Sequence, residues 1–218
     1  YSEAYIAYKN PLYKQIVEET IEFVCRELRD ESGAFYSALD ADTEGEEGKF
    51  YVWKKDELKS ILAGEYDLFA AYYNVNSKGY WEHNNYVLLR DKSDEQFCKK
   101  EKIELKELQQ KVKSWKKILL AQRQKRTRPG LDDKSLTSWN ALMTKGFIDA
   151  YFAFSKQEYF EIALQNAQFI IDRQLQVNGT LFHCYKQKQS TIYVFLEDYA
   201  FTIYTFLQLY LSSYAPKG

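Results

Sequence analysis

Apolar residues recur at spacings of three and four along most of this sequence, which is the pattern of amphipathic helices. The first such stripe covers residues 11–28 and begins at Pro11, where a helix loses nothing by lacking an N–H donor. Further stripes predict helices over 58–62, 68–72, 105–119, 139–154 and 160–171. The last segment, 199–211, is apolar on nearly every side, which predicts a helix that is buried all round.

Short alternating stretches beside glycine separate these helices and predict small β-hairpins. We expect residues 33–37 to pair with 49–53, and residues 179–184 to pair with 191–194. A third copy of this pattern starts at Gly79. Glycines at positions 33, 79, 130 and 179 thus recur at intervals of 46, 51 and 49 residues.

A near-constant period of helix, glycine loop and helix is typical of repeat proteins, in which each unit buries its apolar face against its neighbours. The alternative is that four of the nine glycines are evenly spaced by chance. Stacked helical hairpins form either an open solenoid or a closed α/α toroid, and a helix that is apolar all round favours the toroid. We therefore predict an all-α fold, a partial α/α toroid of about four hairpins with β-hairpin inserts. It would form one domain over residues 1–218.

Composition and charge exclude several classes of protein. Few residues are glycine (9) or proline (3), which argues against disorder, and the formal net charge of −1 gives no basic excess for nucleic-acid binding. No apolar run of about 18 residues predicts a membrane span, and the N-terminus has no signal-peptide pattern. Three separated cysteines predict neither a disulfide framework nor a zinc site, so we expect a cytoplasmic protein without metal or cofactor.

The densest group of polar residues, 40–48, lies at the tip of the first predicted hairpin. Asp40, Asp42 and Glu44 match the first ligand positions of an EF-hand loop, but Tyr51 stands where the bidentate glutamate is required. Calcium binding is therefore not expected. Asp42 and Glu44 remain candidate catalytic carboxylates, and the alternative is a solvated acidic turn.

A second polar group, residues 126–140, forms a loop that runs into a helix. Asp133 lies where an N-cap residue would lie, whereas Asp132 has no such structural explanation. Both aspartates are candidate catalytic groups beside Arg128. Trp139 offers a flat apolar face of the kind on which sugar rings pack, so Arg128 and Trp139 are candidate substrate-binding residues.

A third acidic pair, Glu197 and Asp198, precedes the last helix. Acidic residues in a first turn suit the helix dipole, which is the structural alternative to a catalytic role. In a toroid, the loops that enter the inner helices converge, so the three acidic groups would meet in space. Only two histidines exist, His83 and His183, and they form no metal-binding motif. His183 is a candidate substrate-binding group or general base.

Three segments, FYSALDADTEGEEGKFYVW (35–53), RPGLDDKSLTSWNALM (128–143) and FLEDYAF (195–201), occur here in this order. Together they resemble the thioredoxin-domain-containing, spermatogenesis-associated protein family of the bacterial YyaL type. The resemblance covers essentially the whole chain and implies the later part of an α/α toroid, similar to N-acylglucosamine 2-epimerases and six-hairpin glycosidases. It also implies that a thioredoxin-like domain and the first hairpins are absent from this chain.

The leading hypothesis is a carbohydrate-binding or carbohydrate-processing domain, with glycosidase-like or epimerase-like chemistry at the acidic residues. The alternative is a non-catalytic interaction or structural module that serves the missing thioredoxin-like domain. An incomplete toroid would also leave apolar helical edges exposed, so we expect its first and last helices to pack on each other or on a second copy. The edge residues are Leu12, Ile16, Val17 and Val24 at one end and Phe201, Tyr204 and Phe206 at the other.

Overall fold

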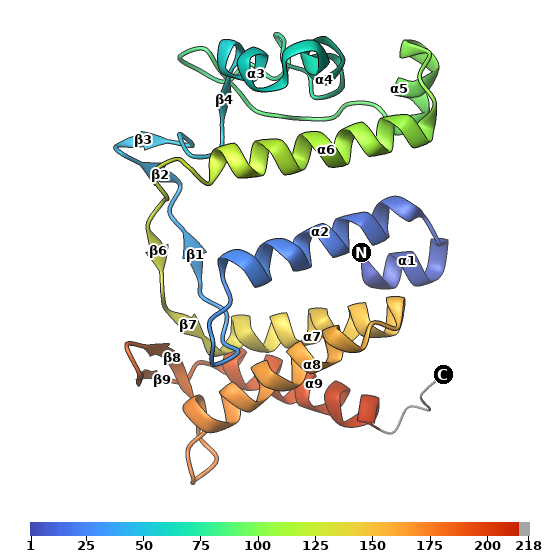
Figure 1. The fold of residues 1–218 in the computed structure, drawn as a ribbon. Helices are drawn as coiled ribbons and strands as arrows, with labels where there is room; N and C mark the ends of the chain where they lie inside the picture. Colours follow the sequence, from blue (N-terminus) through green and yellow to red (C-terminus); the bar gives the residue numbers. More distant parts are fainter. Residues whose placement is uncertain (214–218) are drawn as a thin grey trace. The chain divides into compact units, whose positions relative to one another are not determined.

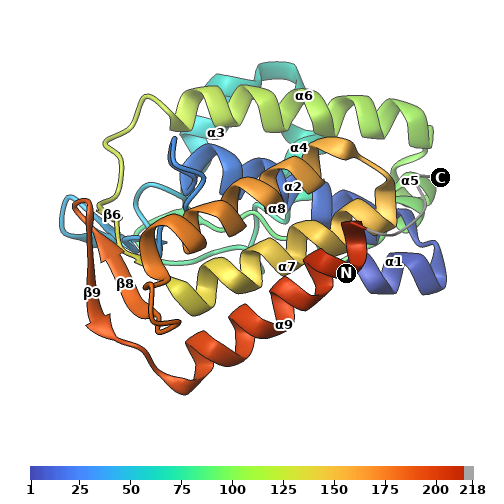
Figure 2. The same ribbon diagram turned by 90° about the horizontal axis from the view of Figure 1, so that it is seen from below.

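The computed structural model describes residues 1–213, which fall into two compact units (Figures 1 and 2). The first unit comprises Tyr1–Leu39 and the chain from Leu131 onward, and the second comprises Asp40–Gly130. Both units consist of helices joined by very short antiparallel sheets. The predicted all-α class with β-hairpin inserts is confirmed, and the helical pairs are consistent with part of an α/α toroid.

The first unit contains five α-helices within the described residues, and three of them lie side by side in both views: α7, α8 and α9. Helix α9 runs parallel to α7, since Asp198 in its first turn contacts Ser138 and Thr205 further along donates to the carbonyl of Ala141. The elements of this unit are α1 (Ser2–Tyr8), α2 (Pro11–Glu27), β1 (Ala38–Leu39), β6 (Leu131–Asp132), β7 (Ser135–Leu136), α7 (Thr137–Phe154), α8 (Gln157–Phe169), a π-helical turn (Ile170–Gln174), β8 (Phe182–Lys186), β9 (Gln189–Tyr193) and α9 (Leu196–Ser213).

The second unit is built on α6, the longest helix of the described chain (Figure 1). Leu58, Phe69, Leu108 and Trp115 form the centre of its core, where the rings of Phe69 and Trp115 meet edge to face at 5.5 Å. Its elements are β2 (Asp42–Thr43), β3 (Glu46–Glu47), β4 (Trp53–Lys54), α3 (Lys55–Leu62), a 3-10 turn (Ala63–Glu65), α4 (Tyr66–Tyr72), β5 (Asn85–Tyr86), α5 (Asp94–Glu101) and α6 (Leu105–Arg123).

Each helix predicted from a hydrophobic stripe is present. Helix α2 begins with Pro11 at its first position, and the side chain of Asn10 accepts a hydrogen bond from the amide of Leu12 at 3.0 Å. Helices α1 and α5 were not predicted. A sequence signal existed for α5, because Ser93 and Gln96 form a reciprocal capping box at its start. Within residues 1–213, no helix combines the length and the apolar character that crossing a bilayer requires.

The pairing of the short strands differs from the prediction at one of two hairpins. Strand β8 pairs with β9, as expected, with Cys184 opposite Thr191. Residues 33–37, however, do not pair with 49–53: the adjoining strand β1 pairs with β6, which is about ninety residues away, and β4 pairs with β5. The prediction was wrong because a two-residue strand carries no periodicity that could select its partner.

Two of the four spaced glycines occupy equivalent turns. Gly33 (φ +89°) and Gly179 (φ +84°) lie in left-handed conformations between bridge pairs that flank the turn in the same way, Arg29 with Phe35 and Leu175 with Leu181. A third turn of this kind is flanked by the bridge of Tyr80 with Tyr86, and Asn84 (φ 62°) occupies the position of the glycine. Gly79, which the spacing predicts for this position, lies five residues earlier. Gly79 serves a close backbone approach, since an added Cβ would lie 2.2 Å from the carbonyl oxygen of Asn74.

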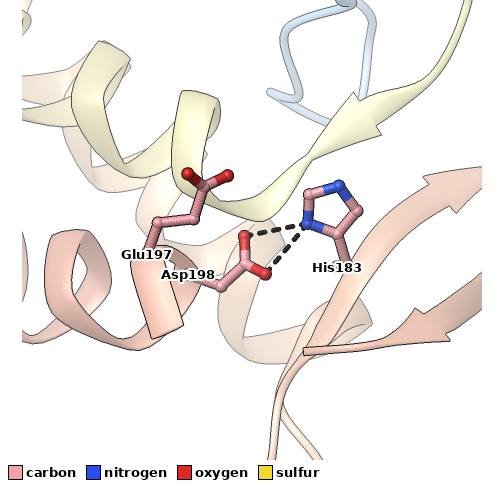
Figure 3. A group of neighbouring side chains, drawn as sticks. All are labelled: His183, Glu197 and Asp198. Carbon is pink, nitrogen blue, oxygen red and sulfur yellow. Dashed lines mark hydrogen bonds and ion pairs between the residues drawn. The ribbon is translucent and has the colours of Figure 1, made fainter. Parts of the chain in front are cut away.

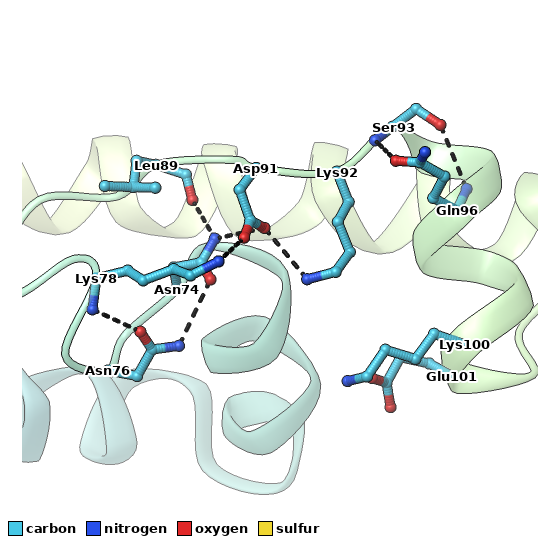
Figure 4. Close-up of polar contacts among 10 residues, drawn as sticks. All are labelled: Asn74, Asn76, Lys78, Leu89, Asp91, Lys92, Ser93, Gln96, Lys100 and Glu101. Carbon is cyan, nitrogen blue, oxygen red and sulfur yellow. Dashed lines mark hydrogen bonds and ion pairs between the residues drawn. The ribbon is translucent and has the colours of Figure 1, made fainter.

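A polar network around Asn74, the residue that Gly79 approaches, fixes the loop after α4 (Figure 4). Asn74 is 3% exposed with φ 53°, and its amide donates to the carbonyl of Leu89 and to the carboxylate of Asp91, both at 3.1 Å. Asp91 also forms ion pairs with Lys78 and Lys92. These hydrogen bonds lower the pKa of Asp91, chiefly the one from Lys78.

A buried amide cluster joins three segments of the first unit. Asn140 on α7 is fully buried, and its side chain donates to the carbonyls of Phe35 (3.0 Å) and Leu136 (2.9 Å) and accepts from the amide of Phe35 (2.8 Å). Asn166 on α8 donates to Asn140 and to the carbonyl of Gly33, both at 2.8 Å. The turn at Gly33 is thereby attached to both helices by satisfied hydrogen bonds.

Helix α9 differs from the prediction, because one of its faces is exposed in the described chain. The other face packs along α7. Ile203, Leu207, Tyr210 and Leu211 are each more than half exposed. An apolar residue on every side of a helix predicts that the whole helix is buried. In the described chain, only the face of α9 that contacts the rest of the first unit is buried.

Candidate functional site

Asp198 is the centre of a polar cluster at the start of α9 (Figure 3). Its carboxylate is fully buried and accepts hydrogen bonds from the amide of Phe195, just before α9, at 2.9 Å and from the amide of Ser138 in the first turn of α7 at 3.0 Å. The first amides of a helix have no partner within that helix, and they carry its positive dipole end. One carboxylate therefore joins the N-termini of two helices, which explains how a buried anion is stabilised there.

His183 on β8 is the third partner of Asp198. Its Nδ1 lies 2.9 and 3.2 Å from the two carboxylate oxygens, and because a carboxylate only accepts, Nδ1 donates. The imidazole side chain is 15% exposed and meets the ring of Phe195 edge to face at 4.7 Å. Nε2 has no hydrogen-bond partner among residues 1–213.

Glu197 adds an exposed carboxylate next to this pair, and Trp139 is an exposed residue of the same helix turn as Ser138. Glu197 accepts a hydrogen bond from the hydroxyl of Ser138 at 3.3 Å and is otherwise open to solvent. Trp139 follows Ser138 in the first turn of α7, and it is 52% exposed. The cluster thus offers an imidazole and an exposed carboxylate from β8 and α9, with Trp139 one position after Ser138 on α7.

The same three ionisable residues could be considered as metal ligands, since one ligand atom of each lies within 4.8 Å of the others. Asp198, however, already uses both oxygens to accept from Ser138, Phe195 and His183. A metal at Asp198 would have to displace hydrogen bonds that satisfy buried amides. This arrangement is that of a buried aspartate that orients a histidine through its Nδ1.

Asp132 and Asp133 lie in the same unit but are not part of the cluster. Asp132 forms an ion pair with Lys134 at 2.9 Å, and Asp133 forms one with Lys186 at 2.8 Å. The hydrogen bond that Lys134 donates lowers the pKa of Asp132, and the hydrogen bond that Lys186 donates to Asp133 raises the pKa of Lys186. Helix α7 begins at Thr137, so the prediction of Asp133 as its N-cap was wrong.

Three further candidate residues lie in the second unit. Asp42 and Glu44 belong to the β2–β3 hairpin, where Glu44 forms an ion pair with Lys49 at 3.3 Å and thereby raises the pKa of that lysine. Arg128 lies over the ring of Phe50 at 5.8 Å. The convergence of all three acidic loops on one site stays a prediction.

The sequence presents Glu197, Asp198 and His183 as separate candidates, and nothing in it indicates that His183 donates a hydrogen bond to Asp198. Nor does it indicate Ser138, whose amide and hydroxyl contact the two acidic residues. Fifteen residues separate His183 from Asp198 and sixty separate Ser138 from Asp198. No local pattern links positions at such distances, so the chain carried no signal for these contacts.

Comparisons with known proteins identify relatives along almost the entire chain. An uncharacterized protein of Caenorhabditis elegans is 29% identical over 93% of the chain, and human and mouse spermatogenesis-associated protein 20 are 27% and 28% identical over 98%. The chain spans about a third of the length of these relatives (32%, 31% and 31%).

No family model matches the chain. Among solved structures, cellobiose 2-epimerase from Bacillus thermoamylovorans aligns with 93% of this chain and 51% of its own, at 14% identity and a TM-score of 0.36. The resemblance found in the three sequence segments is confirmed by the curated relatives: over nearly its whole length, this chain is a homologue of spermatogenesis-associated protein 20.

Proposed function

We propose that this chain is a carbohydrate-binding or carbohydrate-processing domain in which His183 moves a proton. The observation that carries the proposal is the geometry of one half-buried imidazole. Asp198 holds its Nδ1, which leaves Nε2 free to take a proton from a ligand. A buried carboxylate behind a histidine fixes the tautomer and stabilises the imidazolium that forms.

The remaining groups of the cluster suit a polyhydroxylated ligand. Glu197 can accept hydrogen bonds from sugar hydroxyls, and Trp139 can pack against the apolar face of a ring. Hydrolysis by the pair of Glu197 and Asp198 is disfavoured. One oxygen of each residue lies within 4.8 Å of the other, which is too close for inverting hydrolysis (about 6.5–9.5 Å) but near the about 5–5.5 Å of retaining enzymes. Burial argues against hydrolysis, because the oxygens of Asp198 already accept hydrogen bonds from Ser138, Phe195 and His183. Proton transfer by His183, as in an epimerisation, is the reaction class that the cluster supports best.

The test is solvent deuterium exchange. The chain is incubated in D₂O with reducing mono- and disaccharides, and incorporation of deuterium at carbon-bound positions is followed by proton NMR. We expect incorporation with at least one sugar, and we expect its loss in His183→Gln. His83→Gln is the matched control, because His83 is exposed and its nearest carboxylate, Glu82, lies 4.0 Å away. Equal exchange in His183→Gln and in the original chain would overturn the proposal.

A second candidate function, a non-catalytic interaction or structural module, is favoured by the exposed face of α9. Apolar side chains repeat along this face at spacings of three and four: Leu196, Ile203, Tyr204, Leu207, Tyr210 and Leu211. Contiguous apolar surface on one helix is typical of a protein interface. The thioredoxin-like domain expected from the resemblance is the proposed partner. Sedimentation velocity of the chain mixed with that domain, with and without Leu207→Lys, measures whether this face binds it.

A further inference from the structure

The second unit contains a cavity of about 700 Å³, which includes the Glu44–Lys49 ion pair in its lining but no residue of the His183–Asp198 cluster. Four chain segments line it: the β2–β3 hairpin with the residues that follow, the start of α3, the turn at His83 with the start of β5, and the residues just after α6. All lining residues fall between positions 43 and 127, within one compact unit. Its volume lies in the range of small-molecule sites, about 300–1,000 Å³.

Arg126 builds one wall of this cavity and is not available to a ligand. Its guanidinium donates to the carbonyls of Phe50 (2.9 Å) and Val52 (2.8 Å) and forms a two-pronged ion pair with Glu57 at 2.8 and 2.9 Å. It also stacks on the ring of Trp53 with 4.0 Å between the guanidinium carbon and the ring centre. Arg126 thereby fixes the residues just after α6 relative to the segment before α3.

The other charges in the lining are not balanced. Lys49 forms ion pairs with both Glu44 (3.3 Å) and Glu46 (3.5 Å), so these three charged residues already have partners. The ammonium groups of Lys54 and Lys125 have no carboxylate partner within residues 1–213, and the one contact of the Lys125 ammonium is to Gln122. The backbone amide of Lys54 donates to Glu57 at 3.4 Å. Lys54 also directly precedes α3, whose first amides carry the positive end of the helix dipole.

Thr43 also lines the cavity, from the β2–β3 hairpin. It is 5% exposed, and its hydroxyl oxygen is buried without a hydrogen-bond partner in the described structure. Because that oxygen has no surface open to a ligand, the positive charge of Lys54 and Lys125 carries the site.

We propose that this cavity binds a small organic anion whose phosphate or carboxylate group contacts Lys54 and Lys125. The unpaired lysines provide the positive charge, and the Glu44 and Glu46 side of the cavity accepts hydrogen bonds from hydroxyls on the body of the ligand. Sugar phosphates and sugar acids share this chemistry and fit the volume. The site is separate from the proposed proton-transfer site, since no residue of that cluster lines the cavity.

The test is isothermal titration of the chain at low ionic strength with glucose 6-phosphate, gluconate, inorganic phosphate and glucose. We expect either or both organic anions to bind more tightly than neutral glucose, and the comparison of the first two distinguishes phosphate from carboxylate. The double variant Lys54→Gln/Lys125→Gln should bind at least about tenfold more weakly. Lys117→Gln is the control, because Lys117 is exposed on α6 and does not line the cavity.

A second variant is a control within the lining. Thr43→Val keeps the shape of the side chain and removes a buried hydroxyl that makes no hydrogen bond within the described protein, so folding and anion binding are both retained. The proposal is overturned if no anion binds, if the double lysine variant binds as the original chain does, or if Lys117→Gln weakens binding equally. His183→Gln should leave anion binding unchanged, so failure of this site and failure of the proposed function are distinguishable.

Discussion

Replacement of Asp198 by asparagine tests the structural basis of the candidate site. The substitution keeps the size of the side chain but turns one carboxylate oxygen into an amide NH₂ group. Each oxygen of Asp198 faces a buried backbone amide, Oδ1 that of Ser138 and Oδ2 that of Phe195. Either orientation of the asparagine therefore leaves one buried N–H opposite another donor.

The expected loss of stability follows from two contributions. A buried donor left without an acceptor costs about 1–3 kcal/mol. Loss of the negative charge at the N-termini of α7 and α9 adds about 0.3–1 kcal/mol per helix. The total is about 3 kcal/mol, which corresponds to a fall in melting temperature of about 6–12 °C for a chain of this size. Glu197→Gln, which changes an exposed neighbour, should alter stability by less than about 0.5 kcal/mol.

Urea unfolding followed by circular dichroism measures the free energy of unfolding of both variants. Because the chain consists of two compact units, hydrogen exchange at individual amides is needed to localise the effect. We expect the amides of Ser138 and Phe195 to be protected in the original chain and to exchange faster in Asp198→Asn. If the two variants unfold at the same urea concentration, or if these amides are unprotected from the start, Asp198 is not the acceptor that joins the two helices.

Three further predictions concern the fold. Gly79→Ala should destabilise the second unit by at least about 2 kcal/mol in urea unfolding, because its Cβ would meet the carbonyl of Asn74 at 2.2 Å; unchanged stability would contradict that close approach. Asn140→Ala should cost about 3–5 kcal/mol by the same measurement, since it strands buried backbone groups, and a cost below about 1 kcal/mol would show that water replaces them. The lowered pKa of Asp91, caused chiefly by Lys78, contributes stability that is present above its ordinary pKa of 3.8 and is lost as the pH falls below it. Asp91→Asn should therefore flatten the acid limb of a stability-against-pH curve, and an unaltered limb would refute this.

The helices of this protein are determined locally. The stripe that starts at Pro11 produces α2 because apolar residues at spacings of three and four share one face, and Asn10 caps it from the adjacent position. The hairpin of β8 and β9 follows from alternating residues that are close in sequence. Each of these features depends on contacts within about twenty residues, so the sequence alone was enough to predict them.

The tertiary structure decided which short strands pair and which polar groups meet. β1 and β6 join residues about ninety positions apart, and two residues are too few for periodicity to select a partner. The position held by Gly33 and Gly179 is taken by Asn84 in the third turn, because the turn requires a left-handed backbone that asparagine also tolerates. From the sequence alone, Asp198 resembles any acidic residue in the first turn of a helix. It becomes the support of His183 only because packing of α9 against α7 and β8 brings two helix N-termini and one imidazole around a single carboxylate.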